Sequence, residues 1–171
     1  MLKYMFLLVT AVAISLSAKA FSSEIDSTSS DTVQTLPQMT ITNIDTLMNN
    51  AKELYGIRYR YGGTDKKGFD CSGFMQYIMA ESGIEFPRVS VDQYCLGDQV
   101  AKISEVLPGD LLFFNPRNRA KRVGHVGIVS RVEDGKIYMI HASSSRGISE
   151  VCYNECSYWK SRFIGAKRWW F

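Results

Sequence analysis

The run Gly68-Phe69-Asp70-Cys71-Ser72-Gly73-Phe74 places a thiol where a glycine-containing loop is predicted to enter an amphipathic helix. A free thiol has a pKa of about 8.5, which a helix N-terminus and a histidine together can lower to roughly 3.5 to 7.5. The chain contains two histidines, His125 and His141. We therefore predict nucleophilic cysteine chemistry with Cys71 as the attacking group. The alternative is a buried structural cysteine, the ordinary state of a lone cysteine.

The two histidines must share one face of a sheet if they act together. His125 opens one predicted strand, and His141 closes the next. A two-residue turn at Asp134-Gly135 would pair Ile128 with His141 and put His125 on the opposite face. A three-residue loop with Gly135 in the left-handed region, or a β-bulge, would restore a common face. A catalytic pair therefore requires one of these irregularities, and without it each histidine is a structural residue.

Helical periodicity predicts three helices ahead of these strands. The first is expected to begin at Asn43 or Asp45 and to end at Gly56, a natural terminator. The second begins at Cys71, whose sulfur shares a face with the apolar residues three and seven positions later. A short third helix is expected after a cap at Ser90. The thiol is thus placed on the core-directed side of its helix.

Short β-branched and aromatic runs follow the helices and predict an antiparallel sheet. The predicted strands are Leu111–Phe114, Val126–Val132, Ile137–His141 and Phe163–Trp169. Helices followed by strands indicate an α+β fold, with the N-terminal helices packed on the sheet. A length of 171 residues fits one such domain.

The first twenty residues are typical of an export signal. Lys3 precedes the apolar run Tyr4 to Leu16, and Ala18-Lys19-Ala20 provides small residues for cleavage after Ala20. The alternative is a retained membrane anchor. Residues 21–42 are rich in serine and threonine and are interpreted as a flexible tether, which leaves residues 43–171 for the folded domain.

The charge balance argues against a nucleic-acid partner. Without residues 1–20, the chain has 18 basic and 17 acidic residues, a net charge of +1. The local cluster Arg117, Arg119, Lys121 and Arg122 is interpreted as a solvated loop.

Four cysteines leave several arrangements open in an exported chain. Cys152 and Cys156 are close enough in sequence to form a disulfide, and Cys95 is assigned to packing. A zinc site from Cys152, Cys156 and the two histidines does not fit a common ligand spacing. We therefore predict no metal and no organic cofactor.

Taken together, these motifs resemble the NlpC-type family of papain-like cysteine peptidases, and in particular its small single-domain, Spr-type members. The resemblance runs from about Leu54 to Trp169, and its combination of short motifs in one order is specific. The motifs are Tyr59-Arg60-Tyr61-Gly62-Gly63, Phe69-Asp70-Cys71-Ser72-Gly73-Phe74, Pro87-Arg88, Gln93, Pro108-Gly109-Asp110-Leu111, Gly124-His125-Val126-Gly127-Ile128, Ile140-His141-Ala142 and the closing segment Tyr158 to Ala166.

The resemblance implies a catalytic set of Cys71 as nucleophile, His125 as base and later acid, and His141 as the residue that orients His125. It further implies that Tyr59 lies beside the nucleophile, where a core aromatic is the alternative.

Oxyanion or substrate positioning is the role that the resemblance implies for Tyr59, Asp70, Ser72 and Arg88. For Asp70 and Ser72 this means contact with the amino end of a wall peptide. Helix capping is the alternative for both residues.

The activity so implied is hydrolysis of an amide in peptidoglycan, through a thioacyl-enzyme on Cys71. The bond is either D-glutamyl to diamino acid in the stem peptide or D-alanyl to diaminopimelate in the cross-link. The alternatives are an acyltransferase or amidase acting on another envelope molecule, a non-catalytic wall-binding module, and a host-directed effector. We expect an exported monomer, periplasmic or secreted, without a stable protein partner.

Overall fold

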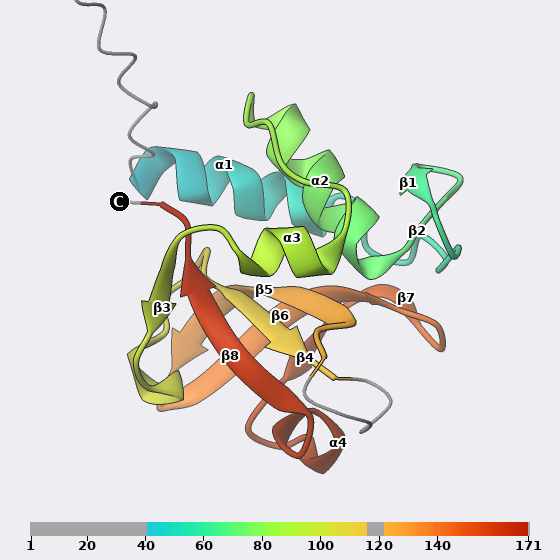
Figure 1. Cartoon of the computed structure of the whole chain (residues 1–171). Helices are drawn as coiled ribbons and strands as arrows, with labels where there is room; N and C mark the ends of the chain where they lie inside the picture. Colours follow the sequence, from blue (N-terminus) through green and yellow to red (C-terminus); the bar gives the residue numbers. More distant parts are fainter. Residues whose placement is uncertain (1–40, 116–121, 171) are drawn as a thin grey trace, which may run out of the picture. The chain divides into compact units, whose positions relative to one another are not determined.

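The computed structural model describes residues 41–115 and 122–170, with side chains from residue 44 onward (Figure 1). The predicted signal sequence and residues 21–40 of the predicted tether lie outside the described residues. So do Arg117, Arg119 and Lys121 of the basic cluster.

Four helices and one 3₁₀ turn lie within the described residues. They are α1 (Ile41–Lys52), α2 (Cys71–Glu81), α3 (Ser90–Tyr94), η1 (Ile103–Glu105) and α4 (Ser157–Lys160). The predicted caps of the first and third helices are wrong, because α1 begins before Asn43 and Ser90 is the first residue of α3 rather than its cap. None of the helices in the described ranges is long and apolar enough to cross a membrane.

The described strands form a two-stranded and a six-stranded antiparallel sheet. The small sheet pairs β1 (Thr64–Asp65) with β2 (Gly68–Phe69). The large sheet has the order β3 (Asp98–Val100), β8 (Phe163–Arg168), β4 (Leu111–Phe114), β5 (His125–Glu133), β6 (Lys136–Ser143) and β7 (Gly147–Cys152). The α+β fold class is confirmed, whereas the edge strands β3 and β7 were not predicted.

Each face of the large sheet has its own apolar core. Helices α1, α2 and α3 lie over one face (Figure 1), where Leu47 and Phe74 pack with Val126 and Ile140 in the larger cluster of buried residues. The other face carries a second cluster with partly buried aromatic residues against it, among them Trp159 of α4. Alternate residues of β5 therefore serve two separate cores, as the period of two in a strand requires.

The hairpin of β5 and β6 contains a β-bulge that decides which way the histidines face. Its turn is the strict two-residue type at Asp134-Gly135, with φ of 49° and 74°, as a type I′ turn requires. Pairing is regular from the turn to Arg131 opposite Tyr138, and then shifts so that Val129 lies opposite Met139. Ser130 is the extra residue of the bulge.

The shift at Ser130 brings both histidines to one face. Beyond the bulge Ile128 pairs with Ile140, so continuing the register places Gly127 opposite His141 and His125 two residues along the same face. A Cβ on Gly127 would lie 3.2 Å from the Cβ of His141. Of the two irregularities that would align the histidines, the structure has the bulge and lacks the three-residue loop.

The side chain of Glu150 in β7 holds the bulge in place. The Ser130 hydroxyl donates a hydrogen bond of 2.6 Å to a carboxylate oxygen of Glu150, and Arg131 forms an ion pair of 3.0 Å with the other oxygen. The extra residue is therefore tied by its own side chain to β7, the strand beyond β6.

Candidate active site

Asp70 caps helix α2 and fixes the residue that follows it. Its backbone is extended (φ −89°, ψ 176°), and its carboxylate accepts hydrogen bonds from the backbone N–H of Gly73 at 2.7 Å and of Gly62 at 2.9 Å. A carboxylate in this position satisfies free N–H groups of the first helical turn. Cys71 is thus the first residue of α2 and is held at a defined helix start.

The side chain of Arg88 closes the remaining side of this cap. Its guanidinium meets both carboxylate oxygens of Asp70, at 2.6 and 3.0 Å, and lies 3.1 Å from the Ser72 hydroxyl. An arginine that pairs with both oxygens of a carboxylate fixes the position of the carboxylate and favours its ionised form. The structure therefore joins Asp70, Ser72 and Arg88 in one network at the helix start that carries Cys71.

The sulfur of Cys71 is buried beside the first residues of β5. Only 8% of Cys71 is exposed, and burial raises the pKa of its thiol, although hydrogen bonds from the backbone N–H groups of Val126 and Ser72 act in the opposite direction. This direction is opposite to the lowering that a helix start and a histidine can give, because the cost of desolvating a thiolate exceeds the help from the helix start. Cys71 rests as a thiol in this environment.

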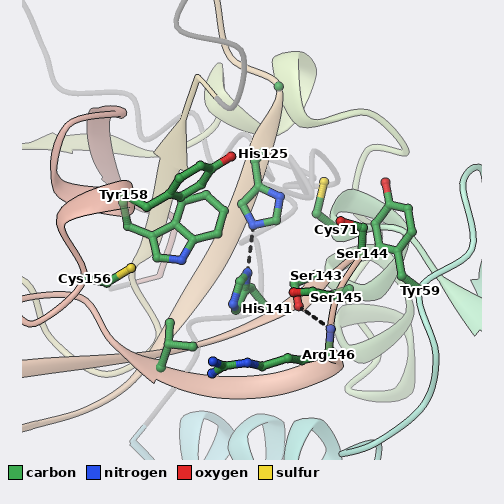
Figure 2. A pocket seen from close by; sticks show the side chains of 14 residues that line it. Tyr59, Cys71, His125, His141, Ser143, Ser144, Ser145, Arg146, Cys156 and Tyr158 are labelled. Atoms are coloured by element: carbon green, nitrogen blue, oxygen red, sulfur yellow. Dashed lines mark hydrogen bonds between the residues drawn. The ribbon is translucent and has the colours of Figure 1, made fainter.

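His125 and His141 form a direct hydrogen-bonded pair. The Nε2 of His125 lies 2.9 Å from the Nδ1 of His141, and the ring planes are nearly perpendicular at 86°. Figure 2 shows Cys71 between His125 and Tyr59, on the side of the His125 ring that faces away from His141. The nitrogen of His125 left for Cys71 is therefore Nδ1.

This geometry assigns the tautomers that a base requires. A neutral His125 that accepts a proton at Nδ1 carries its hydrogen on Nε2, and this N–H donates to the Nδ1 of His141. His141 then carries its own hydrogen on Nε2. In this arrangement His141 fixes both the tautomer and the orientation of His125, as the third member of a catalytic triad does.

Both histidines are buried in their neutral forms. Burial, followed by the neighbouring His141, lowers the pKa of His125 well below its ordinary value. Burial also lowers the pKa of His141 to about 4, with a further contribution from the charge of Arg146. Both groups are consequently uncharged at neutral pH, and His125 is able to accept a proton.

Acid is expected to destabilise the domain through these histidines. An unfolded histidine has a pKa of about 6.5, and that of His141 is about 4, so the unfolded chain binds more protons between these values. Stability present above pH 6.5 is lost as the pH falls, by about 2 kcal/mol between pH 7 and pH 5 from His141 alone. Denaturant unfolding at both pH values measures this loss, and His141→Gln is expected to reduce it. An equal loss in that variant would contradict the assignment.

Trp159 of α4 lies flat against the ring of His125. The ring centroids are 4.6 Å apart with an interplanar angle of 17°, and the indole also meets His141 edge to face at 5.0 Å. Phe114 packs against the same indole at 4.9 Å. The indole therefore holds the plane of the His125 ring, and an aromatic face within about 6 Å favours the protonated form of a ring above it.

Loss of this aromatic face is expected to lower turnover. We expect Trp159→Leu, which keeps apolar packing, to lower kcat about 10-fold on a hydrolysed substrate with KM little changed. Trp159→Phe, which keeps a ring face, is expected to stay within about threefold of the wild type. Steady-state kinetics of the two variants test this, and equal losses in both would contradict a role for the ring face.

These residues line a cavity of about 440 Å³. Of the predicted site residues, Tyr59, Cys71, His125 and His141 line it, whereas Asp70, Ser72 and Arg88 do not. Its far wall is the tip of the β6–β7 hairpin, from Ser143 to Arg146 (Figure 2). A volume of this size accommodates part of a peptide substrate.

The cysteines and histidines do not form a metal centre in the described part of the chain. No group of three or more potential ligand side chains is found there in a suitable arrangement. Cys95, Cys152 and Cys156 are unpaired thiols in this structure, as is Cys71, so the disulfide considered for Cys152 and Cys156 is absent.

Two residues of the cavity wall received no role from the sequence. Trp159 was noted only within the closing motif, because α4 is too short to show a helical period. Arg146 lies in the hairpin tip between β6 and β7, and β7 was not predicted. The sequence signal that could have found them is their residue type, because Trp159 is an aromatic residue in the closing motif and Arg146 is a cation close in sequence to His141.

Comparison with known proteins identifies relatives over most of the described residues. Residues 56–168 match the model of the NlpC/P60 family. The chain is 38% identical to the gamma-DL-glutamyl hydrolase of Bacillus subtilis over 133 residues, which is 74% of this chain and 30% of that protein. It is 37% identical to the Escherichia coli murein DD-endopeptidase MepS/murein LD-carboxypeptidase over 132 residues, covering 75% and 65% of the two chains.

Solved structures agree with this match. An NlpC/P60 family protein from Bacillus cereus superposes with a TM-score of 0.66 at 33% identity, over 78% of this chain and 41% of that one. A protein of the NLP/P60 family from Staphylococcus aureus gives 0.64 at 30% identity, over 78% and 43%. The chain spans less than two thirds of the length of each of these four proteins.

Proposed function

The chain belongs to the NlpC/P60 family, as its motifs predicted, and from this premise we propose that it is a cysteine peptidase that hydrolyses an amide bond in peptidoglycan peptides. The observation that carries the proposal is that the Cys71 thiol and a His125 oriented by His141 line the same cavity. The relatives support the substrate class, because they are named as a gamma-DL-glutamyl hydrolase and a murein endopeptidase.

The reaction begins with proton transfer from the thiol to His125. Cys71 and His125 rest uncharged, since burial raises the pKa of the thiol and lowers that of the imidazole. As the sulfur attacks the substrate carbonyl, the proton moves to the Nδ1 of His125. The imidazolium then gives this proton to the departing amine, leaving a thioacyl-enzyme.

Water completes the cycle by reversing these roles. Neutral His125 takes a proton from water as the hydroxide oxygen attacks the thioester, and returns it to the sulfur when the acid product leaves. His141 keeps the Nδ1 of His125 directed at the reacting atoms throughout, because the Nδ1 of His141 accepts a hydrogen bond from the Nε2 of His125.

The oxyanion that forms on the carbonyl needs hydrogen-bond donors near the sulfur. The backbone N–H of Cys71 at the start of α2 is one candidate, since such groups have no partner within the helix. The Tyr59 hydroxyl is the other, because Tyr59 lines the cavity beside Cys71. Burial and the neighbouring Cys71 raise the pKa of Tyr59, so its hydroxyl stays protonated and able to donate.

Asp70, Ser72 and Arg88 act on the substrate indirectly in this proposal. Their hydrogen bonds to one another and to the helix start leave them outside the cavity lining. For Asp70 the geometry favours helix capping, the alternative considered, over contact with the amino end of a wall peptide. Ser72 lies inside α2 and supports the cap through its hydrogen bonds with Asp70 and Arg88.

Mass spectrometry of digested peptidoglycan tests the proposed function. New stem-peptide or cross-link fragments produced by the purified protein, and not by a Cys71→Ala variant, would support hydrolysis and identify the bond. Adding an amine acceptor distinguishes hydrolysis from acyl transfer, since a transferase would give conjugated products. Absence of any product, with Cys71 shown to be reduced and reactive, would contradict a wall substrate.

The site of action follows from the same proposal. We propose that the protein works outside the cytoplasm as a monomer, after cleavage near Ala20. N-terminal sequencing of the protein recovered from cell fractions and size-exclusion chromatography of the purified protein test these two points.

A further inference from the structure

Arg146 extends from a firmly held hairpin tip at the wall of the cavity. Its backbone N–H donates to the Ser143 hydroxyl at 3.1 Å, and this hydroxyl donates to the carbonyl of Gly147 at 3.3 Å. Gly147 has a φ of 66°, and a Cβ there would lie 2.2 Å from the carbonyl oxygen of Ile57. The tip is therefore closed internally and packed tightly against a neighbouring segment.

Backbone hydrogen bonds fasten this tip to the rest of the domain. Ile148 donates to the carbonyl of Ile57 at 2.9 Å and accepts from the N–H of Gly56 at 2.9 Å. The origin of the Arg146 side chain is consequently fixed relative to the catalytic residues, which is a requirement for recognition of a substrate group.

The charge of Arg146 has no counter-ion within the described part of the chain. Four other arginines there, Arg60, Arg88, Arg131 and Arg168, each form an ion pair with a carboxylate, whereas no such pair includes Arg146. The described lining of the cavity contains no aspartate or glutamate. An arginine exposed to such a cavity is free to pair with an anionic group of a ligand.

The tip that carries Arg146 also provides neutral hydrogen-bond donors. Ser144 and Ser145 line the same wall of the cavity as Arg146 (Figure 2), whereas the Ser143 hydroxyl is already used within the tip. The charge also lies near the catalytic pair, because Arg146 contributes to lowering the pKa of His141. An anion bound here would therefore lie close to His141.

We propose that Arg146 and the hydroxyls of Ser144 and Ser145 form a subsite for a free carboxylate on the substrate peptide, near the two histidines of the cavity. This inference rests on the proposed peptidase function and adds a substrate class, acidic peptides in preference to amidated ones. Arginine suits this task because its planar guanidinium pairs with both oxygens of a carboxylate.

Two positions in a wall peptide supply this chemistry. A glutamyl residue joined through its side-chain carbonyl keeps its α-carboxylate on the acyl side of the bond, and a diamino acid keeps a carboxylate on the amine side. Both present the same group, so synthetic peptides in which one or the other carboxylate is replaced by a carboxamide distinguish them.

Kinetics with matched substrates and variants test the subsite. The substrates are the free-acid peptide and its two mono-amides, and the variants are Arg146→Gln and Arg146→Lys. Lys102→Gln is the control, because Lys102 is 76% exposed, lies outside the cavity lining and gives the same change in net charge.

We expect Arg146→Gln to lower kcat/KM for the free-acid peptide about 10- to 100-fold. For the peptide amidated at the recognised position, wild type and variant should agree within about threefold. Arg146→Lys should keep part of the preference, and Lys102→Gln all of it. Equal losses on acid and amide would overturn the proposal and indicate that Arg146 acts only through His141, and no loss on either would overturn it as well.

Binding to an inactive protein separates this proposal from the peptidase function. Calorimetry with a Cys71→Ala protein compares the free acid with the amides, with and without Arg146→Gln. If the wild type hydrolyses none of the peptides, the proposed function fails, yet tighter binding of the acid that is lost in Arg146→Gln would still support the subsite. Equal affinity for acid and amides, or no binding of either, would overturn it.

Discussion

Replacement of Cys71 by alanine is expected to lower kcat/KM for peptide hydrolysis by about 10⁴-fold or more. The sulfur is the attacking atom in the proposed reaction, and removal of a nucleophile leaves only the contribution of binding and oxyanion contacts. The change removes one buried atom at the start of α2 and leaves the cap by Asp70 in place, so the fold should be retained. Hydrolysis of a wall peptide by wild type and variant, followed by mass spectrometry, measures the effect.

The matched variant for this experiment is Cys95→Ala. Cys95 is exposed and not, as predicted, packed in the core, and it lies outside the cavity lining, so its loss should leave activity within about twofold of the wild type. Thermal unfolding of both variants shows whether they are folded. A folded Cys71→Ala protein that retained more than about a hundredth of wild-type activity would exclude Cys71 as the nucleophile.

Replacement of His125 by glutamine is expected to lower kcat/KM about 10³-fold, the second-largest effect. His125 supplies the proton transfers at both the sulfur and the leaving amine, and general acid-base catalysis contributes roughly 10² to 10⁴. His141→Gln should cost less, about 10- to 100-fold, because His141 meets His125 and acts on the reaction through it.

The double variant distinguishes a shared role from two independent ones. Residues that act as a unit are strongly non-additive, so the protein with both histidines replaced should be close in activity to His125→Gln alone. A multiplied loss would show that His141 acts separately on the substrate, and a larger loss from His141→Gln than from His125→Gln would reverse the assigned roles.

The position of Cys71 at the start of its helix could be predicted from the sequence because the signals are local. Asp70, Cys71 and the apolar spacing that follows lie within one stretch, and α2 begins where they indicate. The strand positions of His125 and His141 were equally local. The pairing of Asp70 with Arg88 was not, because eighteen residues separate them and only the tertiary fold brings them together.

The remaining parts depend on contacts that leave little trace in the sequence. The direction of the Cys71 pKa shift depends on how deeply the sulfur is buried, which a helical pattern alone cannot measure. Trp159 reaches His125 from a four-residue helix near the end of the chain. The position of the extra residue in β5 is likewise invisible to strand periodicity, although the need for an irregularity could be stated.

Because of the bulge at Ser130, the two histidines lie an even number of positions apart in the chain while both side chains lie on the same face of the sheet. Without the extra residue, the same two-residue turn would direct one imidazole into each of the two cores. Between His125 and His141, changes of length in steps of two residues preserve the pair, whereas a single insertion or deletion separates it unless a second one compensates. The extra residue at Ser130 therefore determines that both histidines share one face of the sheet. The hairpin can lengthen by equal additions to both strands while the two histidines stay paired.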